Sequence, residues 1–139
     1  MTASIDTSVL VAAMIDSEFG HASSRSLITS QTCVMYAHGI TETFSTLTGG
    51  RKAFRIKPQL ASELLEDHFI PRLSITTLTP SETLRAMRDA EARGVRGAAI
   101  FDYLHLVAAR KAKARTLYTL NVAHFHAFHR PGDPEITHP

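Results

Sequence analysis

Short apolar segments with strand character alternate with helical patterns along the whole chain, and no linker or internal repeat interrupts them. Strands are predicted at residues 4–5, 32–35, 74–78 and 116–120, with a last edge strand near Ile136. Helices are predicted between them, and the clearest of these covers residues 97–114. This order of strands and helices is typical of an α/β fold built on a parallel sheet.

Polar residues at several junctions indicate where helices begin and end. Asp6-Thr7-Ser8 follows the first strand with short polar side chains, of which Ser8 is the expected helix cap. Thr79-Pro80-Ser81-Glu82 is a capping box with proline at the first helical position, and its helix is expected to end near Gly94. Gly49-Gly50 is expected to end an earlier helix.

Length and composition favour one globular domain over residues 1–139. Hydrophobic residues make up 44% of the chain, and no apolar run is long enough to cross a membrane. The N-terminus shows no signal peptide, and Cys33, the only cysteine, is expected in the core of a protein from a reducing compartment. We therefore expect a cytoplasmic protein. The formal net charge of +2 favours polyanionic partners only weakly.

Four residues that suit metal chemistry lie at predicted strand ends or in helices: Asp6, Glu42, Asp102 and Asn121. They are far apart in sequence, so they can form one site only if the strand ends of a single sheet bring them together. Carboxylate and amide oxygens are the ligands that Mg²⁺ and Mn²⁺ prefer. The sequence thus indicates a candidate metal site at one edge of the sheet.

Each of these residues also has a purely structural explanation. Asp6 suits a helix cap, which stabilises a helix by about 1 kcal/mol, and Glu42 is an ordinary helix residue. Asn121 is equally typical of a turn. Asp102 is the most informative of the four, because it lies within the apolar run 98–107, where a charge is costly to bury without a partner.

Four segments match, in order and spacing, the motifs of a known family. They are Ile5-Asp6-Thr7-Ser8, Glu42-Thr43-Phe44, Ile100-Phe101-Asp102-Tyr103-Leu104-His105 with Val107-Ala108-Ala109 after it, and Tyr118-Thr119-Leu120-Asn121. On these segments the chain resembles PIN-domain proteins. In its short single-domain form it is similar to the VapC-type toxins of bacterial toxin–antitoxin pairs, and the resemblance covers the whole chain.

The resemblance implies a three-layer α/β/α sandwich with a mostly parallel central sheet. It also implies an endoribonuclease that hydrolyses RNA phosphodiester bonds with Mg²⁺ or Mn²⁺. In that reading Asp6, Glu42 and Asp102 are the catalytic metal ligands and Asn121 is an auxiliary catalytic residue. RNA is the implied substrate, a small antitoxin that covers the catalytic cleft is the implied partner, and the implied assembly is a homodimer.

One position departs from the family pattern. The family often carries an aspartate three residues after this asparagine, where this chain has His124. Three carboxylates bring only three negative charges, so we expect one tightly held ion and a second that arrives with substrate. His124 is expected either to contact the scissile phosphate as a cation or to act as a neutral ligand. Its cluster with His126 and His129 matches no closed zinc pattern.

Further residues are expected to support the site. The hydroxyls of Thr7 and Thr119 are expected to hold Asp6 and a bound water by hydrogen bonds. Arg51 and Lys52, in the loop after Gly49-Gly50, are expected to contact RNA phosphates. A second basic group ends the Asp102 helix, where cations are equally explained by the helix dipole: Arg110, Lys111, Lys113 and Arg115.

Two other functions remain open at the level of sequence. In the first, a PIN-like fold with a degenerate active site serves as an RNA- or protein-binding module, and His124 is the feature that favours it. In the second, Asp6 is the nucleophile of a phosphotransfer or phosphatase domain. Asp6-Thr7-Ser8 lacks a second aspartate two residues on, which argues against the common aspartate-based layout.

Overall fold

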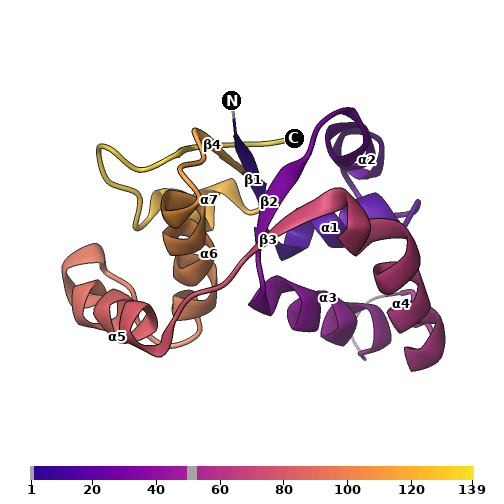
Figure 1. Cartoon of the computed structure of the whole chain (residues 1–139), viewed down its shortest axis with the longest axis horizontal. Coiled ribbons are helices and arrows are strands. Elements are labelled where there is room, and N and C mark those ends of the chain that lie inside the picture. The colour runs from indigo at the N-terminus through magenta and orange to yellow at the C-terminus, as the bar shows by residue number, and fades with distance from the viewer. Residues whose placement is uncertain (1, 50–52) are drawn as a thin grey trace.

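Five short strands form one sheet in which every neighbouring pair runs parallel. The computed structural model describes residues 2–49 and 53–139. The order across the sheet is β3-β2-β1-β4-β5 (Figure 1). The strands are β1 (Ala3–Ile5), β2 (Cys33–Tyr36), β3 (Leu73–Thr76), β4 (Thr116–Tyr118) and β5 (Glu135–Thr137). The expectation of a mostly parallel sheet is confirmed.

Helices cover both faces of this sheet, which gives the predicted three layers (Figure 1). One group comprises α1 (Thr7–Met14), α2 (His21–Ser30), α3 (His38–Thr48) and α4 (Pro58–Leu64), followed by the short turns Leu65–Phe69 and Ile70–Arg72. The other comprises α5 (Pro80–Asp89), the turn Glu91–Arg93, α6 (Ala99–Lys111) and α7 (Val122–His126). The first group lies on the right of Figure 1 and the second on the left.

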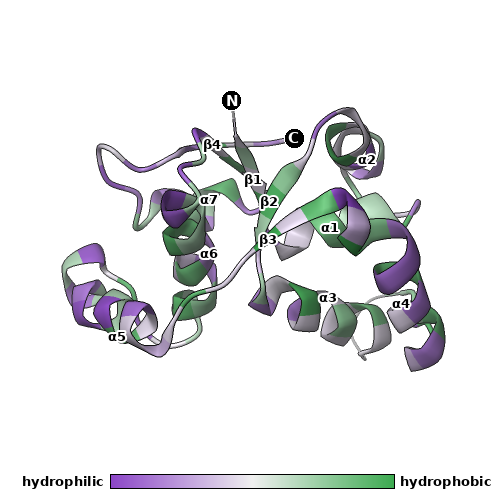
Figure 2. Cartoon of the chain, viewed as in Figure 1, coloured by the Kyte–Doolittle hydropathy of each residue, from purple (hydrophilic) through white to green (hydrophobic). Residues whose placement is uncertain are grey.

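Each face of the sheet has its own hydrophobic core. Ile5 and Met35 belong to the core shared with α1 and α2, whereas Leu117 packs against α6 and α7 on the other face. Cys33 is fully buried in the first core, as predicted, and burial raises the pKa of its thiol to about 11. Figure 2 shows the same division, with apolar segments towards the sheet and polar segments on the outer sides of α4 and α5.

Local sequence signals decide where the helices begin. Thr79 and Glu82 form the predicted capping box, in which each side chain accepts a hydrogen bond from the other residue's backbone N–H. Asp6, and not Ser8 as expected, is the cap of α1, because its carboxylate accepts the hydrogen bond from the backbone N–H of Val9. The single oxygen of Ser8 is directed to Asp6 and to Leu120 instead.

Helix and strand ends differ from the predictions in two places that matter. The helix expected to run to Gly94 ends at Asp89, and a separate turn carries the chain to Gly94, which has a positive φ of 71°. The strand expected over residues 116–120 ends at Tyr118. Thr119 and Leu120 therefore lie beyond the sheet, where their polar groups can bond the start of α1.

Gly49 follows the end of α3 as expected, while Gly50 lies outside the described residues. In the described part of the chain, no helix is both long enough and apolar enough to cross a membrane.

The buried face of α6 should contribute strongly to stability. Leu106 is fully buried, and Leu84 on α5 is 55% exposed. We expect Leu106→Ala to lower the free energy of unfolding by about 2–5 kcal/mol, because it leaves a cavity between α6 and the sheet. Leu84→Ala, the matched control, should change it by less than about 0.5 kcal/mol. Urea unfolding measures both, and equal effects would contradict this assignment of the core.

Candidate active site

The candidate site lies where the direction of chain progression across the sheet reverses. β1 is in the centre, with β2 and then β3 on one side and β4 and then β5 on the other. Ligands of open parallel sheets bind at the carboxyl ends of the strands beside such a reversal. Asp6 directly follows β1, and Thr119 directly follows β4, which pairs with β1 in register Ile5 to Tyr118. The topology thus brings these two segments together.

A cavity of about 340 Å³ opens at this edge of the sheet. Asp6, Asp102 and Asn121 line it, so three of the four residues that the sequence singled out meet in one place. The remaining lining residues are Thr7, Ser8, Val11, Ala12, Glu18, Phe19, Thr46 and Leu120. Glu18 and Phe19 belong to the turn between α1 and α2 and had no signal in the sequence motifs.

The Asp6 carboxylate is held by donors from two parts of the chain. Its side chain is almost fully buried, and Thr119 Oγ1 donates to Oδ2 at 2.6 Å, as predicted. Ser8 Oγ donates to Oδ1 at 2.6 Å, and the backbone N–H of Val9 donates to the same oxygen at 3.3 Å. These three donors fix the direction in which Asp6 presents its remaining lone pairs to the cavity.

Two more hydrogen bonds join the start of α1 to the end of β4. The backbone N–H of Leu120 donates to Ser8 Oγ at 3.0 Å, and that of Asn121 donates to Thr119 Oγ1 at 2.9 Å. Each hydroxyl therefore accepts from the backbone after β4 and donates to Asp6. This arrangement specifies a hydroxyl at Thr119, because an apolar side chain there would leave the buried Oδ2 of Asp6 without its donor, whereas Oδ1 also accepts from the N–H of Val9.

Asp102 reaches the cavity from the first turn of α6 and is about one-third exposed. Burial raises the pKa of its carboxyl, and the negative charges of Asp6 and Glu42 raise it further, against the opposing effect of His105 and His124. The pKa of Asp102 is therefore above the ordinary value for aspartate. A nearby cation would reverse this, because it favours the ionised form of every carboxylate around it.

Glu42 lies beside this cavity on α3, and its contacts fix one oxygen. Thr7 Oγ1 donates to Glu42 Oε1 at 3.1 Å, His105 Nε2 lies 2.8 Å from the same oxygen, and His38 Nδ1 lies 3.7 Å from it. Burial acts to raise the pKa of Glu42, but the hydrogen bonds from His105 and Thr7 and the charge of the two histidines outweigh it, so the pKa is lowered. Glu42 is thus held in its ionised form.

The expected role of Thr7 needs correction. Its hydroxyl does not donate to Asp6 but to Glu42, because α1 turns the Thr7 side chain towards α3 and the Ser8 side chain towards β4. Thr7 therefore supports the second acid of the site, and Ser8 takes the role that was expected of Thr7.

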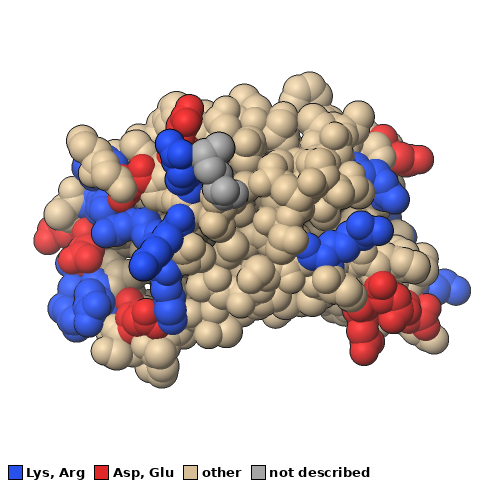
Figure 3. Space-filling view, turned by 45° about the horizontal axis from the view of Figure 1, so that its top comes forward, with Lys and Arg blue, Asp and Glu red and all other residues tan. Residues whose placement is uncertain are grey.

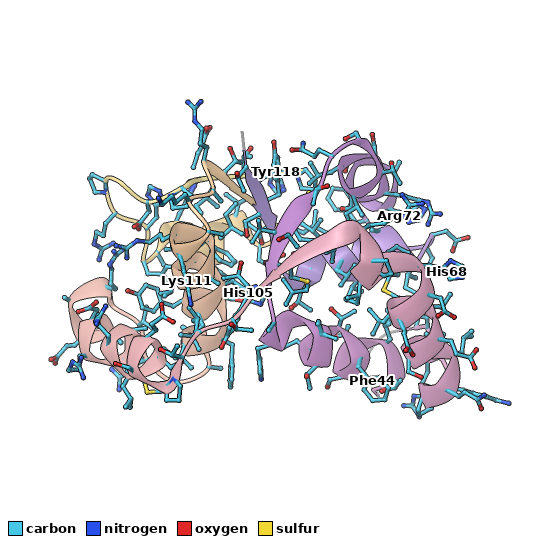
Figure 4. The ribbon with its side chains drawn as sticks, viewed as in Figure 1. Phe44, His68, Arg72, His105, Lys111 and Tyr118 are labelled. Atoms are coloured by element: carbon cyan, nitrogen blue, oxygen red, sulfur yellow. The ribbon has the colours of Figure 1, made fainter. Side chains whose placement is uncertain are left out.

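His105 is a residue of the site that the sequence prediction missed. It is almost fully buried on the side of α6 that faces the centre of the molecule (Figure 4). The ring of Tyr36 meets its ring edge-on, with 5.6 Å between centroids. Its spacing of three residues from Asp102 could have indicated this, because residues i and i+3 lie on one face of a helix. His105 connects the α6 and α3 parts of the site through Glu42.

Asn121 and His124 lie at the rim. Asn121 occupies the N-cap position of α7 but makes no capping hydrogen bond with its side chain, which lines the cavity. His124 is 71% exposed, and its Nδ1 lies 3.9 Å from Asp102 Oδ2. The histidine that replaces the family's aspartate is therefore close to the acids, on the solvent side.

The oxygen atoms at the cavity suit a single divalent cation with an open coordination sphere better than a cation that is fully enclosed by protein ligands. Asp6 and Asp102 offer carboxylate oxygens to one cavity, and Asn121 adds an amide. Across residues 2–49 and 53–139, no three histidine, cysteine, aspartate or glutamate side chains form a group that could hold a metal ion. Glu42 stands apart from the other two acids because His105 and Thr7 bind its Oε1.

The structure describes only one of the two groups of lysines and arginines that the sequence offered as phosphate contacts. Arg51 and Lys52 lie outside the described residues. Lys111 pairs with Glu82 at 2.7 Å and Arg110 with Asp133 at 3.5 Å, so ion pairs account for these two cations in the last turn of α6, where the helix dipole also favours them. On the face in Figure 3, which brings forward the end at which β1 begins, lysines and arginines gather towards the two sides with acids beside them.

Replacement of Asp102 should stabilise the metal-free protein. The pKa of Asp102 is raised in the folded state above its value in the unfolded chain. The free energy of unfolding therefore falls as the pH rises from below the ordinary aspartate pKa to above the raised pKa. We expect Asp102→Asn to have a higher urea midpoint than wild type at pH 7 in EDTA, and the difference to vanish in acid. Exposed Asp67→Asn is the control. A lower midpoint for Asp102→Asn would contradict this account.

Loss of the Thr119 hydroxyl should weaken metal binding. Thr119→Val keeps the shape of the side chain but removes the donor to Asp6 Oδ2. We expect the Mn²⁺ affinity in calorimetry to fall about 10- to 100-fold, from one tight site in the wild type. Thr29→Val is the matched control, because the Thr29 hydroxyl bonds only the backbone of its own helix. Two tight sites in the wild type, or equal affinity in both variants, would count against this geometry.

Comparison with known proteins supports a common fold. Ribonuclease VapC27 of Mycobacterium tuberculosis is 26% identical over 110 residues, which are 79% of this chain and 78% of that protein. The crystal structure of Mycobacterium tuberculosis VapC20, a Sarcin-Ricin loop cleaving toxin, superposes with a TM-score of 0.71 at 16% identity and covers 96% of this chain and 100% of its own.

Two further solved structures, both bound to DNA, are also similar in fold. VapBC2 from Rickettsia felis bound to a promoter DNA fragment gives a TM-score of 0.68 at 18% identity, over 99% of this chain and 98% of that chain. FitAB bound to the IR36 DNA fragment gives 0.65 at 15% identity, over 99% and 95%. The PIN domain family itself matches residues 3–128, which are most of the chain and include every acid of the site. This protein belongs to the PIN domain family.

Proposed function

We propose that this protein is a metal-dependent endoribonuclease and the toxin of a VapBC-type toxin–antitoxin pair, which hydrolyses RNA phosphodiester bonds with Mg²⁺ or Mn²⁺. The observation that carries the proposal is the meeting of Asp6 and Asp102 in one cavity at the carboxyl edge of the sheet, with the ionisation of Asp102 opposed by Asp6. A cation bound beside them would favour the ionised form of Asp102. Membership of the PIN family and similarity to a VapC ribonuclease support it.

In this proposal the three acids have different roles. Asp6 and Asp102 hold the cation, and Asn121 contributes an amide oxygen or orients a water. When bound, the cation neutralises charge on the scissile phosphate and makes a nearby water more acidic. Glu42 orients the attacking water and accepts its proton, a role for which the lowered pKa keeps it ionised. Water attacks phosphorus, the bond to the leaving oxygen breaks, and that oxygen takes up a proton.

Supporting residues keep this arrangement in place. Thr119 and Ser8 hold Asp6, while Thr7 and His105 hold Glu42 through Oε1. These contacts all meet Glu42 at Oε1, and in the proposal Oε2 is the oxygen that contacts the water. His124, at the exposed rim beside Asp102, contacts the phosphate backbone of the bound RNA when it is protonated.

The proposed partners follow from the relatives. VapBC2 and FitAB share this fold, and the chain resembles VapC-type toxins, so we propose a small antitoxin that covers the cavity and a homodimer as the assembly of the toxin. We also propose a cytoplasmic location, where RNA and antitoxin are both present. Arg51 and Lys52 remain proposed phosphate contacts.

A second candidate is a PIN-fold binding module without catalysis. The specific observation in its favour is His124, which takes the place of an acid close to Asp102 and supplies no carboxylate for a metal ion. Such a module would still bind RNA or a protein partner, but it would not need Asp102.

Cleavage of RNA with and without Asp102 separates these two functions. End-labelled cellular RNA is incubated with the wild type and with Asp102→Asn, each in Mg²⁺, Mn²⁺ or EDTA. We expect discrete fragments from the wild type with metal, and a rate lower by a factor on the order of 10²–10³ for the variant. The variant, purified identically, controls for contaminating nuclease. Binding of RNA at equal affinity by both proteins without metal-dependent cleavage would establish the binding module instead.

A further inference from the structure

Phe19 is the most exposed large hydrophobic side chain in the described part of the chain, with 85% of its surface open to solvent. The next, Leu84 on α5, is 55% exposed. Phe19 lies in the turn between α1 and α2 and lines the cavity that contains Asp6 and Asp102. A large apolar side chain held in water at the mouth of a polar cavity has no role in the packing of this fold, which suggests a role in binding.

The turn that carries Phe19 is well fixed. The backbone N–H of Glu18 donates to Ile15 O and that of His21 to Glu18 O, both at 3.1 Å. His21 Nδ1 lies 2.7 Å from Ala12 O, which can only accept, so the ring donates this hydrogen bond. The backbone of the turn is thus ordered before a ligand arrives, which lowers the entropy lost on binding.

Gly20 holds the same turn close to the end of β4. It has a positive φ of 80°, and a Cβ added there would lie 2.9 Å from the Cδ2 atom of Leu120. Any other residue there would be strained by the positive φ and would have to displace the Leu120 side chain. The backbone next to Phe19 thus lies beside Leu120, which follows β4 together with Thr119 and Asn121 of the site.

The Phe19 ring is largely open to solvent and so to a ligand. Across residues 2–49 and 53–139, no aromatic ring or cation stacks on it. The other exposed phenylalanine near the acids, Phe101, already stacks on His38 with 5.7 Å between centroids and an interplanar angle of 10°. Phe19 therefore offers a free π-face at the cavity, whereas Phe101 has one face covered.

The ring stands between two hollows. One is the acidic cavity, and the other, of about 610 Å³, is lined by Gly20, Leu120 and His138 among others. Glu18, Phe19 and Leu120 line both. A strand whose phosphate lies at Asp6 and Asp102 would pass over Phe19 on its way into the second hollow, so the nucleotide next to the scissile bond would meet the ring.

We propose that Phe19 is a stacking platform for a nucleobase of single-stranded RNA, next to the phosphate held at the acidic cavity. This rests on the proposed ribonuclease function. Unpaired bases stack on aromatic side chains whatever their identity, because every base has a π-face. The platform positions the strand and favours unpaired RNA over duplex. An antitoxin contact is less favoured, because Asp16, Ser17 and Ser23 around the ring are exposed and polar and do not form an apolar patch.

The absence of tryptophan from the sequence gives a direct test of stacking. Phe19→Trp in an Asp102→Asn background introduces a single tryptophan and slows cleavage. We expect titration with a short single-stranded oligoadenylate in Mg²⁺ to quench its fluorescence saturably, and the same strand in a duplex to quench it much less. Leu84→Trp in the same background is the matched control and should not respond. Equal responses at both positions, or none at Phe19→Trp, would overturn the proposal.

Steady-state cleavage of single-stranded RNA separates stacking from a simple apolar contact. Phe19→Ala is expected to raise KM at least about fivefold with a smaller change in kcat, as for loss of one base–aromatic stack. Phe19→Leu should be equally impaired because it lacks a π-face, while Phe19→Tyr should remain close to wild type. Leu84→Ala is the control for unspecific loss of an exposed side chain. A wild-type KM for Phe19→Ala would refute the role of the ring.

The outcomes for this proposal and for the ribonuclease function are distinguishable. If the wild type cleaves RNA and Phe19→Ala does so with the same KM, only the platform is wrong. If Phe19→Ala loses affinity for the antitoxin instead, the ring is a protein contact, which also overturns the platform. If the wild type does not cleave RNA but Phe19→Trp is quenched by single strands, the platform holds and the enzyme function fails.

Discussion

A carboxylate that is removed from water must be hydrogen-bonded by the protein, and Asp6 meets this requirement with donors from two separate segments. Val9 and Ser8 supply two donors from α1, and Thr119 supplies the third from beyond β4. The same hydroxyls accept from the backbone that follows β4. Because Asp6 is held in this way, β4 has to end at Tyr118, and α1 has to start where it does. The candidate site is a consequence of this one junction.

The acids around the junction lie close enough to influence one another. Burial and the charges of Asp6 and Glu42 raise the pKa of Asp102, whereas His105 and Thr7 overcome burial to lower the pKa of Glu42. The two acids thus differ in environment although both face the same edge of the sheet. Hydrolysis needs two carboxylates with different environments, because one has to bind a cation and the other has to stay ionised beside a water. It also makes the folded state less stable than an uncharged site would allow.

Much of the fold follows from local sequence. The order of elements, the capping box at Thr79, the cap region at Asp6-Thr7-Ser8 and the edge strand at Ile136 are each confirmed close to where they were predicted. The errors lie at element ends. Strand propensity alone predicts a strand that continues to Leu120. In the structure the strand ends at Tyr118, because Thr119 and Leu120 form hydrogen bonds to Asp6 and Ser8 instead. Propensity cannot detect a partner more than a hundred residues away.

The sequence by itself determined the α/β class and the acids worth testing, because hydrophobic period and short polar caps are local properties. Only the tertiary structure decided which side chains share a cavity: Asp6, Asp102 and Asn121 with Glu18 and Phe19, and Glu42 beside it under the control of Thr7 and His105. The reason is geometric. Parallel strands bring distant segments to one edge, and whether a hydroxyl such as that of Thr7 or Ser8 faces one neighbour or another depends on helix rotation, which no short stretch of sequence records.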